Sequence, residues 1–159
     1  MKIIFHNLRI GIAILITKIT ILILRLLGRG GTTLPGKLAL KICPSLFSDL
    51  SDRFRIIMIT GTNGKTTTAR IISGMLNQAG IKFITNKSGA NLSSGIATTL
   101  VSSLSLTGKS LVRTALLETD EGAFRTIAPK LKPEIIIVTN FFEDQLDRFG
   151  HVYATLNSV

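Results

Sequence analysis

The chain has 159 residues, 45% of them hydrophobic and 18% charged, which suffices for one domain with a buried core and excludes two large domains. Its formal net charge is +10: residues 1–55 hold nine Lys/Arg against two Asp, or +7, and the remainder holds ten against seven acids, or +3. Aromatic residues make up 6% and no cation cluster is interleaved with them, so we expect no nucleic-acid partner, and the basic region favours an anionic membrane surface.

An apolar segment from Ile3 to Leu27 predicts one long helix that ends at the glycines following it. Its length suits a membrane span, but Lys18 would lie well inside that span. Arg9 lies roughly opposite Lys18 and Arg25, so the helix is not cleanly amphipathic. Three interpretations stay open: a helix on or partly in the membrane surface, a true span, and a helix packed on a partner domain. A cleaved signal peptide is disfavoured because no small-residue cleavage site follows.

We expect residues 1–28 to form this basic helix and residues 29–54 to form a connecting segment, punctuated by Pro35 and Pro44. Cys43 is the only cysteine, so the chain can form neither an internal disulfide nor a cysteine-based metal site, and no zinc site is expected.

The stretch that follows has the order of a strand, a phosphate-binding loop and a helix. Gly61 and Gly64 allow backbone N–H groups to turn inward around an anion. Lys65 would place its charge on the outer phosphates, Thr66 would offer its hydroxyl to Mg²⁺, and the helix beginning near Lys65 would present its positive end. Ile59 stands where the strict phosphate-loop pattern has its first glycine, and an ordinary strand-to-helix turn is the alternative. The predicted nucleotide-binding residues here are Gly61, Thr62, Asn63, Gly64, Lys65, Thr66 and Thr67.

Further along, strand-like and helix-like runs alternate, which predicts an α/β fold with a doubly wound, mostly parallel sheet. The expected helices are 66–79, 92–104 and 122–128, and the expected strands are 81–85, 110–118 and 134–139. Ligands in such sheets bind beyond the carboxyl ends of the strands, and polar residues follow each apolar run. We therefore expect four strand ends to meet at one site.

Carboxylates gather in the same part of the chain, since every Asp and Glu after residue 55 lies between Glu118 and Asp147. Oxygen atoms are the ligands that Mg²⁺ prefers. Glu118 is the strongest candidate because it ends an apolar strand. Asp120, Glu121, Glu143 and Asp147, each taken singly, could equally be solvated loop charges or helix N-caps.

The motif Thr60-Gly-Thr-Asn-Gly-Lys-Thr-Thr67, with Asn140 and Asp144-Gln-Leu-Asp147 downstream, resembles the central ATPase domain of the Mur ligases. Amino-acid-adding members usually carry Asp-His-x-Asp at the last motif, where the histidine helps to hold a second metal. Gln145 stands at that position here. This departure counts against an amino-acid-adding ligase.

Other motifs are similar to the MurT branch, the Mur-ligase-like subunit of lipid II isoglutaminyl synthase. They are Gly30 to Gly36, Ser88 to Asn91, Glu118 to Gly122 and Asn140 to Gly150. On this resemblance, residues 55–159 are expected to form a Mur ligase central domain that is truncated at its C-terminus. Relatives continue with a zinc insertion and a C-terminal domain, so a truncated, non-catalytic nucleotide-binding remnant remains an alternative.

The resemblance implies a ligase that uses ATP and Mg²⁺ in peptidoglycan precursor synthesis at the inner face of the cell membrane. The α-carboxylate of D-glutamate in the lipid II stem peptide would be phosphorylated, and ammonia from a GatD-like glutamine amidotransferase subunit would displace the phosphate. Lys65 would stabilise charge on the γ-phosphate, and Thr66 and Glu118 would bind metal. Further expected site residues are Gln145 at the metal, Asn140 at the nucleotide, and Ser88, Asn91, Asp120 and Asp144 on the substrate side.

Overall fold

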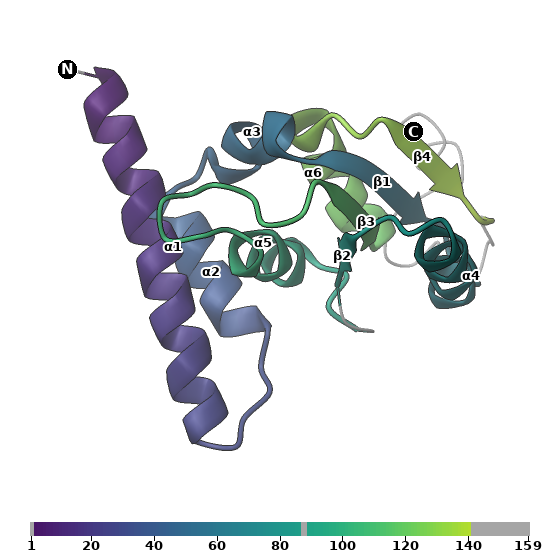
Figure 1. Cartoon of the computed structure of the whole chain (residues 1–159), viewed down its shortest axis with the longest axis horizontal. Coiled ribbons are helices and arrows are strands. Elements are labelled where there is room, and N and C mark those ends of the chain that lie inside the picture. Colours follow the sequence, from purple (N-terminus) through teal and green to yellow (C-terminus); the bar gives the residue numbers. More distant parts are fainter. Residues whose placement is uncertain (1, 87–88, 141–159) are drawn as a thin grey trace.

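The structure, a computed structural model, describes residues 2–86 and 89–140, with side chains described from Leu8 onward (Figure 1). Its helices are α1 (Lys2–Leu26), α2 (Thr33–Ile42), α3 (Leu46–Leu50), α4 (Lys65–Gln78), α5 (Ser93–Ser102) and α6 (Glu121–Leu131), with a 3-10 turn η1 (Ser51–Arg53). Its strands are β1 (Arg55–Thr60), β2 (Phe83–Thr85), β3 (Thr114–Glu118) and β4 (Ile135–Val138).

The four strands form one parallel sheet in the order β2-β3-β1-β4. In its register Ile59 of β1 lies beside Glu118 of β3 and Ile137 of β4. The chain leaves β1 through α4 toward the β2 edge and then returns through α5 and α6 toward the β4 edge. The predicted α/β class with a parallel sheet is confirmed, and the loop after β1 lies where the direction of winding changes.

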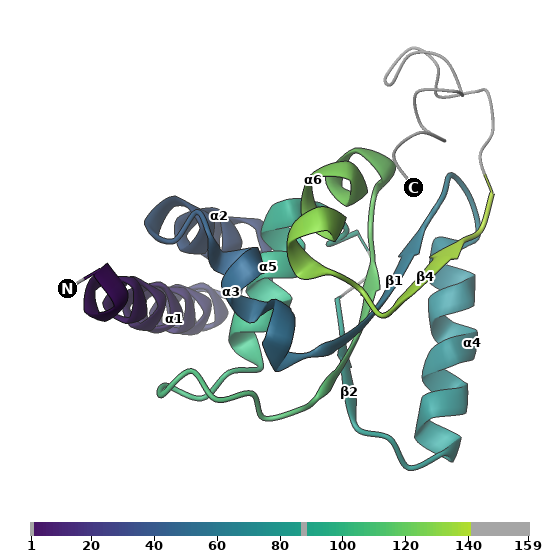
Figure 2. The same ribbon diagram turned by 90° about the horizontal axis from the view of Figure 1, so that it is seen from above.

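The sheet is covered on both faces, which explains why β1 is apolar without alternation from Ile56 to Ile59. Ile56 and Met58 enter the larger core with side chains of α3, α5 and α6. Ile57 and Ile59 face the opposite way, toward α4. Figure 2 shows α4 alone on one side of the sheet and the other helices on the other side.

The predicted connecting segment 29–54 is largely helical. It contains α2, α3 and η1, and Ala39, Leu46 and Leu50 from it are fully buried in the core. A Cβ atom on Gly36 of α2 would lie 1.7 Å from the backbone oxygen of Ser94 in α5, so the two helix backbones approach too closely for any side chain there. Residues 29–54 therefore belong to the packed structure around the sheet.

The region around Cys43 is part of this packing. The side chain is 1% exposed, and burial raises the pKa of its thiol. A protonated, buried thiol behaves as a small apolar group.

Helix α1 forms the outermost layer, packed against α2 and α5. Over the described part of the chain, no helix is long and apolar enough to cross a membrane.

Several predicted boundaries differ from the structure, such as the strand expected from residue 81, which begins at Phe83, and two of them have local reasons. The strand expected from residue 110 begins at Thr114, because the residues before it form a turn at Gly108, closed by a bridge between Leu104 and Ser110. The helix expected to end at 128 continues through Pro129 to Leu131.

Candidate nucleotide-binding site

The loop between β1 and α4 depends on two glycines. Gly61 has φ 125° and Gly64, at the N-cap of α4, has φ 83°, both in the region that L side chains rarely adopt. A Cβ atom on Gly61 would also lie 2.3 Å from Thr139 Oγ1 and 2.7 Å from the backbone oxygen of Asn140. Only glycine fits at position 61, because both its backbone conformation and its surroundings exclude a side chain.

The carboxyl end of β4 holds the tip of this loop. Asn140 Oδ1 accepts a hydrogen bond from the backbone N–H of Asn63 at 2.9 Å, and Asn140 Nδ2 donates to the Asn63 carbonyl at 3.1 Å. The backbone N–H of Thr62 donates to the Asn140 carbonyl at 2.8 Å. Asn140 thus positions the loop by bonding to both backbone groups of Asn63 through its side chain and to Thr62 through its carbonyl.

Lys65, the first residue of α4, is folded back across the loop. Its Nζ donates to the carbonyl of Gly61 and, at 3.0 Å, to the carbonyl of Thr62. Its side chain is only 13% exposed, and Nζ lies 4.0 Å from Glu121 Oε1. An ammonium ion held this way lies at the start of α4, where an anion would meet both the charge and the helix dipole.

Glu118 and Thr66 meet between β3 and α4. Thr66 Oγ1 donates to the Glu118 carboxylate, 3.0 Å from Oε1 and 2.9 Å from Oε2, and Glu118 is 7% exposed. The buried Asn86 fixes the backbone of Glu118, accepting from its N–H at 2.9 Å and donating to its carbonyl at 2.8 Å. A carboxylate and a hydroxyl are therefore placed side by side at the end of the sheet.

Glu121, which the sequence left open as a solvated loop charge or a helix N-cap, is a buried carboxylate beside Lys65. It is 6% exposed, and its Oε1 has no hydrogen-bond partner, although Lys65 Nζ lies 4.0 Å away. A buried carboxylate oxygen without a hydrogen bond is energetically costly, and such groups gather at functional sites. Its position at the start of a helix, directly after a strand that ends in Glu118, is the signal that could have selected it.

The other predicted site residues lie at the same sheet edge, on the exposed side of α4, or outside the described part of the chain. Asp120 is the N-cap of α6, with its side chain accepting from the Gly122 N–H at 3.0 Å, which fits the N-cap alternative. The Asn91 carbonyl accepts from the Asp120 N–H at 3.0 Å, so Asn91 lies at the same sheet edge. Thr67 is exposed on the first turn of α4. Three predicted residues lie outside the described part of the chain: Ser88, Asp144 and Gln145.

These residues fit a nucleotide with Mg²⁺. Lys65 and the positive end of α4 suit phosphate oxygens, and Thr66 with Glu118 supplies the oxygen donors of a hard cation. Within residues 8–86 and 89–140 there is no group of three or more His, Cys, Asp and Glu that could hold a metal ion. This sparse donor set suits Mg²⁺, which usually binds through one or two carboxylates and takes its remaining ligands from phosphates and water.

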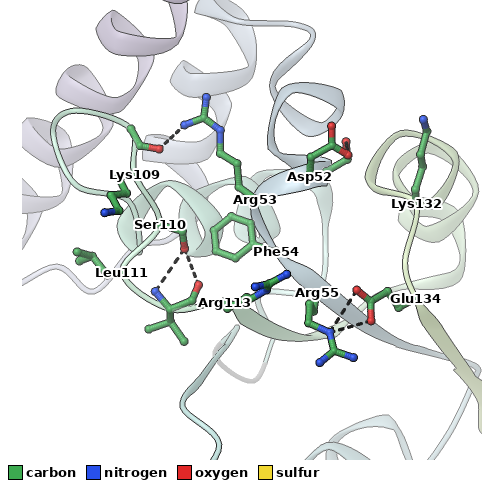
Figure 3. Close-up of a pocket in the computed structure, with 13 residues that line it drawn as sticks. Asp52, Arg53, Phe54, Arg55, Lys109, Ser110, Leu111, Arg113, Lys132 and Glu134 are labelled. Atoms are coloured by element: carbon green, nitrogen blue, oxygen red, sulfur yellow. Dashed lines mark hydrogen bonds and ion pairs between the residues drawn. The ribbon is translucent and has the colours of Figure 1, made fainter.

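A cavity of about 940 Å³ lies elsewhere, at the amino ends of β1 and β3 (Figure 3). None of the predicted site residues lines it. Arg55 and Glu134 form an exposed ion pair there at 3.0 Å, and Arg53 Nη1 donates to the Gly108 carbonyl. Because ligands of parallel sheets bind at the carboxyl ends of the strands, the phosphate-loop edge and not this cavity is the candidate site.

The sequence is similar to known proteins over most of its length. The family described as "Mur ligase middle domain" matches residues 59–158. The MurT subunit of lipid II isoglutaminyl synthase (glutamine-hydrolyzing) from Streptococcus pneumoniae is 40% identical over 154 residues, which cover 96% of this chain and 34% of that protein. The MurT subunit from Staphylococcus aureus strain COL is 36% identical over 136 residues, covering 85% of this chain and 30% of that protein.

The chain thus spans about a third of the length of these curated relatives. A crystal structure of MurF from Acinetobacter baumannii superposes with a TM-score of 0.59 at 19% identity, covering 76% of this chain and 26% of that one. At that identity the likeness is one of fold.

Proposed function

Because this chain belongs to the Mur ligase family, as the resemblance of its motifs predicted, we propose that it binds ATP with Mg²⁺ as part of an amide ligase of peptidoglycan precursor synthesis. Its MurT relatives are named as subunits of lipid II isoglutaminyl synthase. Since the chain spans about a third of their length, we assign to it the nucleotide-binding part of that activity.

The observation that carries the proposal is the contact of Thr66 with Glu118. The hydroxyl lies 2.9 Å and 3.0 Å from the two carboxylate oxygens, directly beside the loop that begins α4. Glu118 is buried and its backbone is fixed by Asn86. A pair held this firmly needs little rearrangement to take a cation between its oxygen atoms.

Each side chain has a proposed role. The backbone N–H groups from Gly64 to Thr66, at the positive end of α4, bind phosphate oxygens. Lys65 turns from the carbonyls of Gly61 and Thr62 to the γ-phosphate, where its charge offsets the charge of the transferred group. Thr66 and Glu118 bind Mg²⁺, and Gln145 is proposed to contribute at the metal from outside the described residues. The metal, when bound, neutralises phosphate charge during transfer.

The reaction proposed for a protein of the relatives' length follows from the same chemistry. An α-carboxylate oxygen of D-glutamate in lipid II attacks the γ-phosphorus of ATP, and ADP leaves. Ammonia, supplied by a GatD-like glutamine amidotransferase subunit, then attacks the carbonyl carbon of the acyl phosphate. Phosphate leaves, the nitrogen loses a proton, and D-isoglutamine remains. Asn91, Asp120, Ser88 and Asp144 are proposed to lie on the substrate side.

Titration calorimetry of Mg·ATP into the whole chain tests the proposal. Lys65→Ala is expected to weaken binding by about tenfold to a hundredfold, the worth of a charge-assisted hydrogen bond to phosphate. Lys82→Ala is the matched control, since Lys82 is an exposed lysine beyond the far end of α4. Equal binding by parent and Lys65→Ala, with both melting alike, would contradict the proposed phosphate site.

A further inference from the structure

Helix α1 uses only one of its faces to pack on the protein. Ile10, Ala13, Ile14 and Thr17 are at most 6% exposed and lie toward α2 and α5. Figures 1 and 2 both show these helices on one side of α1, with no described element on the other side. The outward face therefore needs its own explanation.

That outward face is apolar over most of the helix. The side chains on it recur every three or four residues and are between 39% and 79% exposed. They are Leu8, Ile12, Leu15, Ile19, Leu22, Ile23 and Leu26. We call this set the outer stripe. It extends for roughly 27 Å along the helix, at the usual rise per residue.

Positive charges border the outer stripe on both sides. At 3.6 residues per turn, Arg9 lies at one margin, and Lys18 and Arg25 lie at the other. No Asp or Glu occurs before Asp49. From the sequence alone the helix is not cleanly amphipathic, because its cations point in opposite directions. The structure gives the reason: α1 has two apolar faces, and the cations separate them.

The margin with Arg25 adjoins a cavity of about 390 Å³ between α1, the residues after it, and α5. Arg25 and Arg29 line this cavity together with the polar side chains of Thr99 and Ser102. An anionic group beside the stripe would therefore meet two guanidinium groups, which bind phosphate well.

We propose that the outer stripe seats α1 in the surface of an anionic lipid bilayer, with the helix axis parallel to the surface. An apolar face bordered by Arg and Lys is the pattern of helices that lie in the headgroup region. Pairing of two copies through the stripe would bring Arg9, Lys18 and Arg25 of each copy together with no acid in the first 48 residues to offset them. This inference rests on the proposed function in one respect: the lipid-linked substrate of that function would lie at the same bilayer surface.

Vesicle co-sedimentation of the whole chain tests this. The probes are vesicles of phosphatidylglycerol and phosphatidylcholine in equal parts, and vesicles of phosphatidylcholine alone. The parent is expected to bind the anionic vesicles at least about tenfold more tightly, with binding that weakens as salt is raised. The double variant Leu15→Ser with Ile19→Ser is expected to lose at least about tenfold in partitioning.

The matched control is Ile71→Ser with Met75→Ser, a pair at the same spacing on α4 that is 56% and 63% exposed. It is expected to bind vesicles as the parent does. The variant Arg9→Gln with Arg25→Gln is expected to lose the preference for anionic vesicles while keeping its fold, as circular dichroism would report.

Vesicle binding needs no nucleotide, so its failure and the failure of the proposed ATP site are distinguishable. The inference is overturned if the folded parent does not bind anionic vesicles, or if the Leu15/Ile19 variant binds as well as the parent. It is also overturned if light scattering finds a parent dimer that this variant converts to monomer without any vesicle binding, since the stripe would then join two copies.

Discussion

The two ends of the sheet both gather charged residues, but they do so differently. At the carboxyl end Glu118 and Glu121 are 7% and 6% exposed, and the Lys65 side chain is 13% exposed. At the amino end the Arg55 and Glu134 side chains are 61% and 49% exposed and line a wide cavity. Buried groups hold fixed positions and interact strongly, whereas exposed ones are screened by water. We therefore base the proposed site on the burial of the charged groups and not on the volume of the cavity.

The largest expected effect is at the loop itself. Gly61→Ala combines a strained φ of 125° with an overlap against Thr139 and Asn140. We expect a loss of about 4 kcal/mol in stability, or failure to fold, measured by urea unfolding. Gly74→Ala on the exposed side of α4 is the control, where a Cβ atom would meet nothing within 4 Å. It should be neutral or stabilising by up to about 1 kcal/mol. Equal stability of the two variants would mean that the loop does not have this geometry.

A smaller effect is expected at the support of Glu118. Asn86→Ala removes a buried amide that bonds to both backbone groups of Glu118 and to the Ala90 carbonyl. Leaving these groups unpaired should cost about 3 kcal/mol in unfolding free energy. Asn86→Asp keeps the bond to the Glu118 N–H but loses the donors, so it should also destabilise the chain. A variant as stable as the parent would show that water replaces the amide without cost.

The contact of Asn140 with the tip of the phosphate loop should contribute less to the stability of the chain than the contacts of Asn86 do. Asn140→Ala loses two hydrogen bonds to the backbone of Asn63, which is exposed and can bond to water instead. We expect a loss of about 1 kcal/mol in stability and several-fold weaker Mg·ATP binding, because the loop is less ordered before it binds. Calorimetry and thermal melting separate the two effects, and unchanged binding would remove Asn140 from the site.

The smallest effect is expected at the amino end of the sheet. Arg55→Ala breaks an ion pair whose partners are both about half exposed. Such pairs contribute less than about 1 kcal/mol, and the variant should bind Mg·ATP as the parent does. A large loss of nucleotide binding in Arg55→Ala would contradict the proposed site at the carboxyl end of the sheet and would favour the cavity as the nucleotide site.

The phosphate loop and the order of strands and helices were predictable because their signals are local. Gly61, Gly64 and Lys65 define the loop, and apolar runs define the strands on either side. What could not be predicted is which polar side chain after each strand turns inward. Asn86 and Glu121 do so through contacts with residues 32 and 56 positions away. The sequence shows that each follows a strand, but it does not show which way the side chain turns.

The helices within 29–54 were missed for a different physical reason. Pro35 and Gly36 look like helix breakers, but Pro35 lies in the first turn of α2, where its missing N–H has no intrahelical partner to lose. Gly36 lies where α2 meets the Ser94 carbonyl of α5. The outer stripe of α1 could not be recognised from the sequence either. It stands out as a separate apolar face only in the structure, where the other apolar face of α1 is buried.

The most direct test of the central claim is the Mg²⁺ dependence of ATP binding, measured by titration calorimetry on the whole chain and on Glu118→Gln. Glu118→Gln keeps the size of the side chain and an oxygen that can accept from Thr66, but it removes the charge that would hold the cation. We expect Mg²⁺ to tighten ATP binding by the parent at least about tenfold, and we expect this gain to be largely lost in Glu118→Gln while ATP alone binds both chains alike. A folded parent that binds ATP equally with and without Mg²⁺, or a variant that keeps the full gain, would contradict the central claim.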